Sequence, residues 1–291
     1  MISIIISSTD PVYLSNVQQN IKETIGVPYE VISVNNGDGQ RGLCEIYNSC
    51  AVQARYELLC FMHEDLKILT TDWGLKVIEI FNDEKIGLLG VAGADYKALT
   101  PTGWACPGIE AASNKVNIVQ RYKYKGNETN HEFYNANHEV LSQVASIDGV
   151  WMCTRKEIAL ERKFDEGLLK QFHGYDIDFS LNVASSYAVV VTYDVLLEHF
   201  SEGDYSADWL DATLKVNYKY KQSLPLNIGN YDQWECRFAE KSACKKLLKI
   251  LSGNGYGAFK KLGILWKYEL YRVLGMKQFI LFQLNILISR Y

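Results

Sequence analysis

The sequence predicts an α/β protein in which a mostly parallel sheet is flanked by helices and followed by a helical C-terminal extension. Over roughly the first ninety residues, short apolar runs rich in β-branched side chains alternate with segments of helical pattern. This alternation indicates strand–helix–strand units with parallel strands. Polar clusters follow three of the apolar runs, at the strand ends where such sheets bind their ligands.

Local signals place the first half of the elements. A strand is expected at 2–7, and a helix begins at Asp10-Pro11, with aspartate as N-cap and proline in the first helical position, and ends at Gly26. The stretches "YEVISVNNGDG", "YELLCF" and "IGLLGVAG" predict three further strands, the first of which closes in a polar turn. Helices are expected at 42–54 and at about 72–82.

The second half is less regular. Residues 95–145 show no clear period and are expected to be loops. Beyond them, "VASIDGVWMCTRKEI" predicts a strand that runs into a helix, and Asp176 and Asp178 open another helix. A last strand is expected to end at His199. We therefore expect a catalytic domain at 1–215 and a helical extension at 216–291.

Composition and charge limit the kind of protein. Of the 291 residues, 48% are hydrophobic and 22% charged, as in a soluble protein with a sizeable core. The seven cysteines form no CxxC pair, which indicates reduced thiols and a cytoplasmic location. We see neither a signal-peptide pattern nor an apolar run near the ~20 residues of a membrane span.

The charge is divided unevenly along the chain. Residues 241–291 contain ten Lys or Arg and one acid, a net charge of +9, so the remaining residues carry −4 − 9 = −13. An acidic body argues against nucleic acid as a partner. In the basic part, lysines and apolar residues recur at near-helical spacing over 259–274, which suits either contact with an anionic membrane surface or a packed helical subdomain. The spacing leaves both open.

The three polar clusters are expected to converge on one crevice. They consist of Ser8, Thr9 and Asp10; of Asn35, Asn36 and Asp38; and of His63, Glu64 and Asp65. The first strand is not followed by GxGxxG, so a dinucleotide is not indicated. Acids at a strand end can hold a divalent cation, which in turn meets a diphosphate. Asp65 is the preferred ligand, and the first two clusters are candidates for contacts with a nucleotide.

The order of these motifs resembles the family 2 glycosyltransferases of the GT-A fold, particularly a bacterial subset with a histidine in its acidic motif. The matching pieces are "SIIISSTD", "VISVNNGDG", Asn48 in "EIYNSCAVQA", "FMHED", "IDGVWMCTRKEI", "KFDEGLLKQFHGYDIDFSL" and "LEHFSEG". Together they cover about residues 1–200. The chain departs from the family in two places: His63 replaces the first acid of the Asp-x-Asp motif, and Tyr175 stands where glutamate is common.

The resemblance implies a role for each matching residue. Asp176 would be the catalytic base, and His63, Asp65 and His199 would hold Mn²⁺ or Mg²⁺. Asn48, Asp148 and Gly149 would bind the sugar nucleotide. The implied reaction is inverting transfer of a sugar from a nucleotide-diphosphate sugar to a hydroxyl of a glycan or lipid-linked acceptor, in bacterial surface polysaccharide or glycolipid synthesis.

Two other functions remain to be weighed, together with the location and the oligomeric state. A sugar-1-phosphate nucleotidyltransferase should carry a glycine-rich basic loop after the first strand, and "SSTDPVYL" has neither feature. The alternative function is a non-catalytic relative that binds a sugar nucleotide or glycan as a scaffold, which the loss of an acid at His63 favours. A lipid-linked acceptor would bring the basic tail to the inner face of the cell membrane as a peripheral contact. The sequence also allows a homo-oligomer.

Overall fold

The computed structural model describes residues 1–121, 129–200 and 205–288. The chain forms two compact units. Unit 1 contains Met1–Gly93 and Lys115–Gly203, and unit 2 contains Ala94–Asn114 and Asp204–Tyr291. Residue 215, the predicted end of the catalytic domain, falls within helix α7 (Ala207–Lys219) of unit 2. The division into a catalytic part and an extension stays a prediction.

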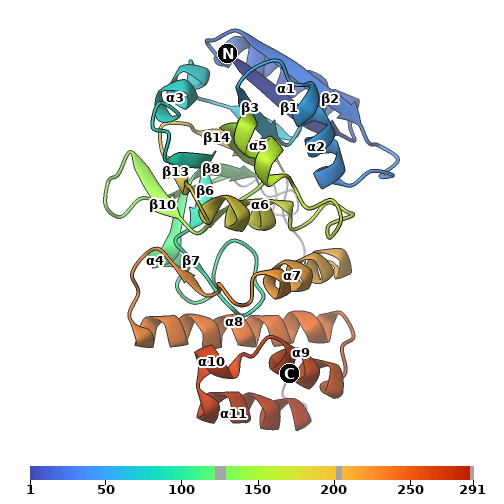
Figure 1. The fold of residues 1–291 in the computed structure, drawn as a ribbon, viewed down its shortest axis with the longest axis vertical. Helices are drawn as coiled ribbons and strands as arrows, with labels where there is room; N and C mark the ends of the chain where they lie inside the picture. The colour runs from blue at the N-terminus through green and yellow to red at the C-terminus, as the bar shows by residue number, and fades with distance from the viewer. Residues whose placement is uncertain (122–128, 201–204, 289–291) are drawn as a thin grey trace. The chain divides into compact units, whose positions relative to one another are not determined.

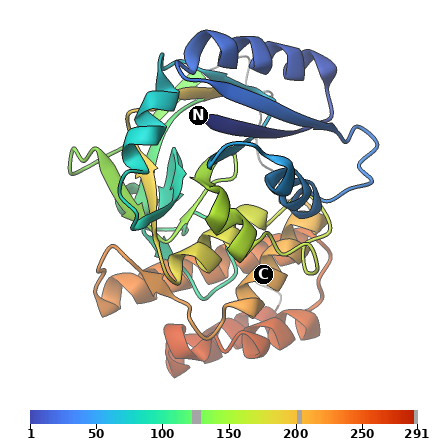
Figure 2. The ribbon, with the colours of Figure 1, turned by 45° about the horizontal axis from the view of Figure 1, so that its top comes forward.

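Unit 1 is built on a seven-stranded sheet (Figures 1 and 2). Its strands are, in spatial order, β10 (Leu141–Val144), β13 (Ala188–Thr192), β5 (Ile86–Gly90), β12 (Trp151–Arg155), β3 (Leu58–Met62), β1 (Ile2–Ser8) and β2 (Tyr29–Asn35). β1 is parallel to β2 and β3, and β13 is parallel to β5. β12 and β10 run antiparallel to their neighbours. Since the other five strands share one direction, the predicted mostly parallel sheet is confirmed.

A second sheet carries the strand that ends at the predicted metal site. Its strands are β11 (Ser146–Ile147), β6 (Ala92–Ala94), β8 (Asn114–Arg121), β14 (Leu197–His199) and β4 (Leu66–Ile68), with β9 (Thr129–Tyr134) paired to β8. The antiparallel register of β14 and β4 sets His199 opposite Leu66. The backbone N–H of Phe200 also donates to the carbonyl of Asp65, at 3.0 Å.

The expectation of loops over 95–145 is wrong for much of this segment, which contains β8, β9 and β10. The strand β8 was missed because its buried positions do not read as an apolar alternation. Val116 and Ile118 are buried as expected of a strand, but Asn117 between them is also buried. Its amide donates to the carbonyls of Tyr193 and Val195, at 2.8 and 3.2 Å. Residues 122–128 of this segment lie outside the described residues.

The helices of unit 1 begin and end close to their predicted positions. They are α1 (Pro11–Thr24), α2 (Leu43–Gln53), α3 (Trp73–Ile80), α5 (Lys156–Arg162) and α6 (Tyr175–Ala184). The carboxylate of Asp10 caps α1 by accepting from the backbone N–H groups of Val12 and Tyr13. Figure 2 shows α1 on one side of β1 and β2, with α2 and α5 on the other.

An aromatic cluster fixes the start of α6. The ring of Tyr47 in α2 lies 4.8 Å from Phe61 in β3 and 5.5 Å from Tyr175, the first residue of α6. Phe164 stacks on Phe179 one turn further along α6, at 4.3 Å between ring centroids. All five rings are buried. Because close-packed aromatic rings have little freedom to move, the cluster holds Tyr175 rigidly against the carboxyl end of β3.

Unit 2 is mainly helical. Its elements are α4 (Glu110–Ser113), α7, α8 (Gln233–Gly253), α9 (Ala258–Lys267), α10 (Tyr271–Leu274) and α11 (Met276–Leu287), with β7 (Tyr96–Lys97) paired to β15 (Leu226–Asn227). The predicted C-terminal helical extension is thus confirmed. Glu240 of α8 is fully buried, and its carboxylate accepts from the backbone N–H groups of Leu99 and Thr100, at 2.8 and 3.0 Å.

The basic segment 259–274 is two short helices rather than the one amphipathic helix that its spacing indicated. α9 ends at Lys267, and α10 begins at Tyr271. The apolar residues Leu265 and Leu270 are buried, and so is Lys261, whose ammonium donates to the Ser252 hydroxyl at 2.7 Å. Within the described residues, no helix is both long and apolar enough to cross a membrane.

Candidate functional site

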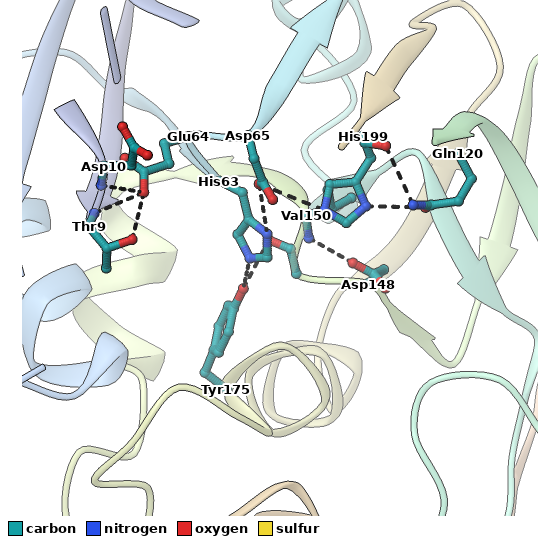
Figure 3. A network of polar contacts seen from close by, with 11 residues as sticks. Thr9, Asp10, His63, Glu64, Asp65, Gln120, Asp148, Val150, Tyr175 and His199 are labelled. Carbon is teal, nitrogen blue, oxygen red and sulfur yellow. Dashed lines mark hydrogen bonds and ion pairs between the residues drawn. The ribbon is translucent and has the colours of Figure 1, made fainter. Parts of the chain in front are cut away.

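Two histidines and an aspartate meet at the carboxyl end of β3. His63 directly follows β3, Asp65 directly precedes β4, and His199 is the last residue of β14. The Nδ1 of His63 and the Nε2 of His199 each lie 3.8 Å from the same oxygen of Asp65, Oδ1 (Figure 3). One potential ligand atom from each residue lies within 4.8 Å of the others. The structure thus brings together the three residues predicted to hold a metal ion.

The spacing of these atoms suits ligands of one cation. At 3.8 Å the nitrogens are too far from Asp65 for hydrogen bonds, whereas ligands bound at about 2 Å to one ion stand roughly 3–4 Å apart. The Nε2 of His199 is buried and has no hydrogen-bond partner among the described residues. Burial lowers the pKa of His199, which favours the neutral imidazole that a metal ligand requires. The residues present therefore fit a divalent cation.

Outer partners orient both imidazoles. The Nδ1 of His199 lies 3.2 Å from the carbonyl oxygen of the Gln120 side chain, which can only accept, so Nδ1 carries the proton and Nε2 has a free lone pair. The Nε2 of His63 lies 2.9 Å from the Tyr175 hydroxyl. That hydroxyl donates to the carbonyl of Gly149 at 3.1 Å, so it accepts from His63 Nε2–H and leaves Nδ1 free. In both rings the free nitrogen is the one that faces Asp65.

Gly149 and Tyr175 fit each other closely. A Cβ atom on residue 149 would lie 2.2 Å from the Tyr175 hydroxyl oxygen, so only glycine leaves room for the phenol. Burial raises the pKa of Tyr175, and the phenol therefore keeps the proton that it donates to Gly149. Val150, one residue further on, accepts from the backbone N–H of His63 at 3.1 Å. The pairing of β12 with β3 thus carries residues 148–150 to the histidine.

Asp176 follows Tyr175 in the first turn of α6. Burial, and next the charge of Asp148, raise the pKa of Asp176 to about 7, although backbone N–H groups of Ile177, Asp176 and Gly149 act in the opposite direction. The N-terminal end of the helix dipole would by itself favour the ionised carboxylate. Desolvation outweighs the dipole, so near neutral pH both the protonated and the ionised form of the Asp176 carboxyl are populated.

Glu64 points away from the two histidines and forms hydrogen bonds with the loop after β1 (Figure 3). One of its oxygens accepts from the backbone N–H and the hydroxyl of Thr9, at 2.8 and 2.9 Å, and from the N–H of Asp10 at 3.0 Å. It therefore ties the carboxyl end of β1 to that of β3. Glu64 and His63 therefore face opposite sides of the turn after β3.

Most residues predicted to contact the nucleotide lie in the loops after β1 and β2, whereas Asn48 lies in α2 and bonds the backbone of another segment. The Ser8 carbonyl accepts from the N–H of Asn36 at 2.7 Å, so the ends of β1 and β2 lie side by side. Asn35 and Asp38 are exposed, and each accepts from a backbone N–H two residues further on. Asn48 bonds Phe164 instead, donating to its carbonyl and accepting from its N–H, both at 2.9 Å. The roles of these residues toward a nucleotide stay predictions.

The contacts of Tyr175 with His63 and of Gln120 with His199 were not predicted from the sequence. Tyr175 occupies a motif position where glutamate was expected, and that substitution beside Asp176 was the available signal. Gln120 lies in a strand that showed no period, so nothing in the sequence pointed to it.

Tyr175→Phe is expected to weaken Mn²⁺ binding by about 10–100-fold, the usual effect of losing a partner that orients a ligand. Without the hydroxyl, His63 can present either nitrogen to Asp65. Isothermal calorimetry with Mn²⁺ measures the change. Tyr193→Phe is the control, because it removes the same group from a tyrosine whose hydroxyl contacts the Ser142 hydroxyl. Equal Mn²⁺ affinity in wild type and Tyr175→Phe would contradict the role assigned to Tyr175.

Comparison with known proteins gives a family and a fold. The sequence model of a family described as "Glycosyltransferase like family" matches residues 3–215. Among solved structures, GalNAc-T7 with UDP, GalNAc and Mn2+ is similar with a TM-score of 0.50 and 11% identity, over 87% of this chain. This chain covers only 56% of the GalNAc-T7 chain. That likeness confirms the predicted GT-A fold.

S. aureus TarS, residues 1–349, has a TM-score of 0.49 and 13% identity, over 94% of this chain and 83% of that chain. No curated protein matches the chain.

Proposed function

Because the chain belongs to the glycosyltransferase-like family, we propose that it moves a sugar from a nucleotide-diphosphate sugar to a hydroxyl acceptor with inversion at the anomeric carbon. The observation that carries this proposal is that the structure contains both a candidate metal site and a carboxyl group suited to act as a base. A cation-type donor set is formed by His63, Asp65 and His199, and a carboxyl with a pKa of about 7 lies at Asp176. Inverting transfer needs a site for the leaving diphosphate and a base for the acceptor.

Asp176 is the proposed base. Its carboxylate would take the proton of the acceptor hydroxyl as the oxygen attacks the anomeric carbon from the face opposite the leaving group. A general base works best when its pKa lies near the working pH, and Asp176 meets this condition because of its burial and the neighbouring charge of Asp148. Asp148 thus contributes by keeping the carboxylate basic.

His63, Asp65 and His199 would hold the cation. A bound divalent ion would neutralise the diphosphate and assist its departure. Between the two ions predicted from the sequence, two imidazoles beside one carboxylate favour Mn²⁺, since Mg²⁺ prefers oxygen ligands and keeps its waters. Ser8, Thr9, Asp10, Asn35, Asn36 and Asp38 are the proposed contacts for base and ribose. The closeness of the β1 and β2 ends supports their joint use.

The acceptor is proposed to be a glycan or lipid-linked hydroxyl in the synthesis of a bacterial surface polysaccharide or glycolipid. This part rests on the sequence resemblance. A cytoplasmic location is proposed from the cysteines, which form no CxxC pair, and a place at the inner face of the membrane from the lipid-linked acceptor. The similar structure of GalNAc-T7 contains UDP, GalNAc and Mn2+, which supports a sugar nucleotide as donor.

A binding screen tests the proposed function. Nucleoside diphosphates and sugar nucleotides are added to the full chain with and without Mn²⁺, and the melting temperature is measured. A ligand that binds only the folded chain raises the melting temperature by mass action. The donor should give a shift that requires Mn²⁺ and should be hydrolysed slowly. Binding without hydrolysis or transfer would favour the scaffold alternative, and no binding at all would overturn the transferase.

The rate of transfer is expected to rise with pH through about 7. Asp176 accepts a proton only when ionised, and its pKa is raised to about 7, so the rate falls as the pH drops below that value. Asp148→Asn removes the second cause of the shift and should move the acidic limb to lower pH. Rate profiles of kcat at saturating donor, normalised to each maximum, measure this. An unchanged limb in Asp148→Asn would contradict the electrostatic role.

A further inference from the structure

Helix α11 is apolar on two sides. Phe279, Phe282 and Ile286 are buried, and the ring of Phe279 packs against Trp266 and Tyr271. The opposite side exposes large apolar side chains, with exposed fractions between 43% and 60%: Met276, Ile280, Leu281, Leu284, Leu287 and, directly after the helix, Ile288. A contiguous exposed patch of large apolar side chains usually marks an interaction site. We therefore expect another molecule or surface to cover the exposed side of α11.

The exposed side continues onto α9. The indole N–H of Trp266 donates to the side-chain carbonyl of Gln283 at 3.1 Å, and its ring packs edge-on against Phe279 at 4.9 Å. Trp266 is nevertheless 53% exposed, and Phe259, seven residues earlier on the same side of α9, is 86% exposed. We call these two residues, together with the five exposed apolar residues of α11 and Ile288 directly after it, the α9–α11 face.

The charges beside this face are positive. Lys260 and Lys267 adjoin Phe259 and Trp266 in the sequence, Lys277 adjoins Met276, and all three lysines are exposed. Residues 258–288 contain one acid, Glu269, and it forms ion pairs with Lys221 and Arg272. A second copy of the chain would bring like charges together, whereas an anionic surface complements the face.

We propose that the α9–α11 face lies in the interface of an anionic membrane, with its aromatic and aliphatic side chains at the headgroup–acyl boundary and its lysines toward lipid phosphates. Such a helix lies along the membrane plane, and none of the described helices could span it. The stretch that carries most of the face is "MKQFILFQLNILI", rather than the segment 259–274 that the lysine spacing favoured. The surface is independent of the catalytic site, so either proposal can fail alone.

Vesicle binding of the full chain tests the proposal. Vesicles of phosphatidylcholine with about one third phosphatidylglycerol are compared with pure phosphatidylcholine by co-sedimentation. Wild type should bind the anionic vesicles, and the double variant Ile280→Glu with Leu284→Glu should bind at least about 10-fold more weakly. Both residues are half exposed, so the fold should tolerate the change. The variant Lys260→Gln with Lys277→Gln should lose much of the preference for anionic lipid.

A matched control separates the face from general charge effects. Val52 and Leu75 are exposed apolar residues of α2 and α3 in unit 1, and their double change to glutamate should leave vesicle binding intact. An equal loss in this control, or no sedimentation of wild type with anionic vesicles, would overturn the proposal. A lipid-free dimer that only Ile280→Glu with Leu284→Glu dissociates would instead assign the face to a second copy.

Discussion

Asp176→Asn is expected to lower the rate of sugar transfer by about 10²–10⁴-fold, the range that a positioned general base contributes. The amide has the shape of the carboxyl and can still accept from the backbone N–H groups of Ile177 and Gly149, but it cannot take a proton from the acceptor. Donor binding, measured by the Mn²⁺-dependent thermal shift, should be unchanged. A loss of both rate and donor binding would point to a structural role instead.

The same variant should be more stable than wild type at alkaline pH. Since the folded-state pKa of Asp176 is raised to about 7 from an ordinary value of 3.8, the folded chain binds this proton more tightly than the unfolded chain does. Stability is therefore lost as the pH rises from about 4 to 7. The amide of the Asp176→Asn variant does not ionise, so the variant's melting temperature above pH 7 should exceed that of wild type by about 2–4 °C. Asp178→Asn, two residues on, is the control.

Asp178 is a useful control because it is fully buried in the same first turn, where we expect it to hold the start of α6. Replacing it should lower the melting temperature at every pH. If Asp178→Asn gained stability in the same pH range and Asp176→Asn did not, the raised pKa would belong to Asp178 rather than to Asp176.

The sequence predicted those parts of the site that depend on local patterns. It did not predict the parts that depend on contacts between distant segments. His63, Asp65 and His199 were found because each ends or adjoins a strand, and strand ends can be read from apolar runs. Their common approach depends on the pairing of β14 with β4, which no local pattern shows. The motif resemblance supplied that link.

Elements whose buried or exposed side chains have an unexpected polarity could not be predicted from the apolar pattern. Asn117 fills a buried strand position because its amide finds two backbone carbonyls, so the alternation that identifies a strand is broken at β8. Gln120 was lost with that strand. On α11 the difficulty is the reverse: apolar residues occupy both sides, and only the structure shows that Phe279 and Phe282 are inside while Ile280 and Leu284 are outside.

Asp65→Asn is expected to weaken Mn²⁺ binding by more than about 100-fold, a larger loss than that of an outer partner such as Tyr175. Asp65 supplies the only negative charge of the cluster, and both free imidazole nitrogens face its Oδ1. Transfer with Mn²⁺ should fall to the background rate, because the diphosphate would leave without electrophilic assistance. Calorimetry with Mn²⁺ and the thermal shift with donor measure the two consequences separately.

Glu64→Gln is the matched control, since it makes the same chemical change one residue away. The Glu64 carboxylate bonds Thr9 and Asp10 and points away from the histidines. Its amide should lower the melting temperature by loosening the β1 loop, yet leave Mn²⁺ affinity within about 3-fold of wild type. Mn²⁺ affinity lost in Glu64→Gln and kept in Asp65→Asn would place the cation at the β1 loop and remove the role of His63 and His199. The opposite pattern, together with a donor shift that requires Mn²⁺ in wild type and is absent in Asp65→Asn, would tie donor binding to the cation.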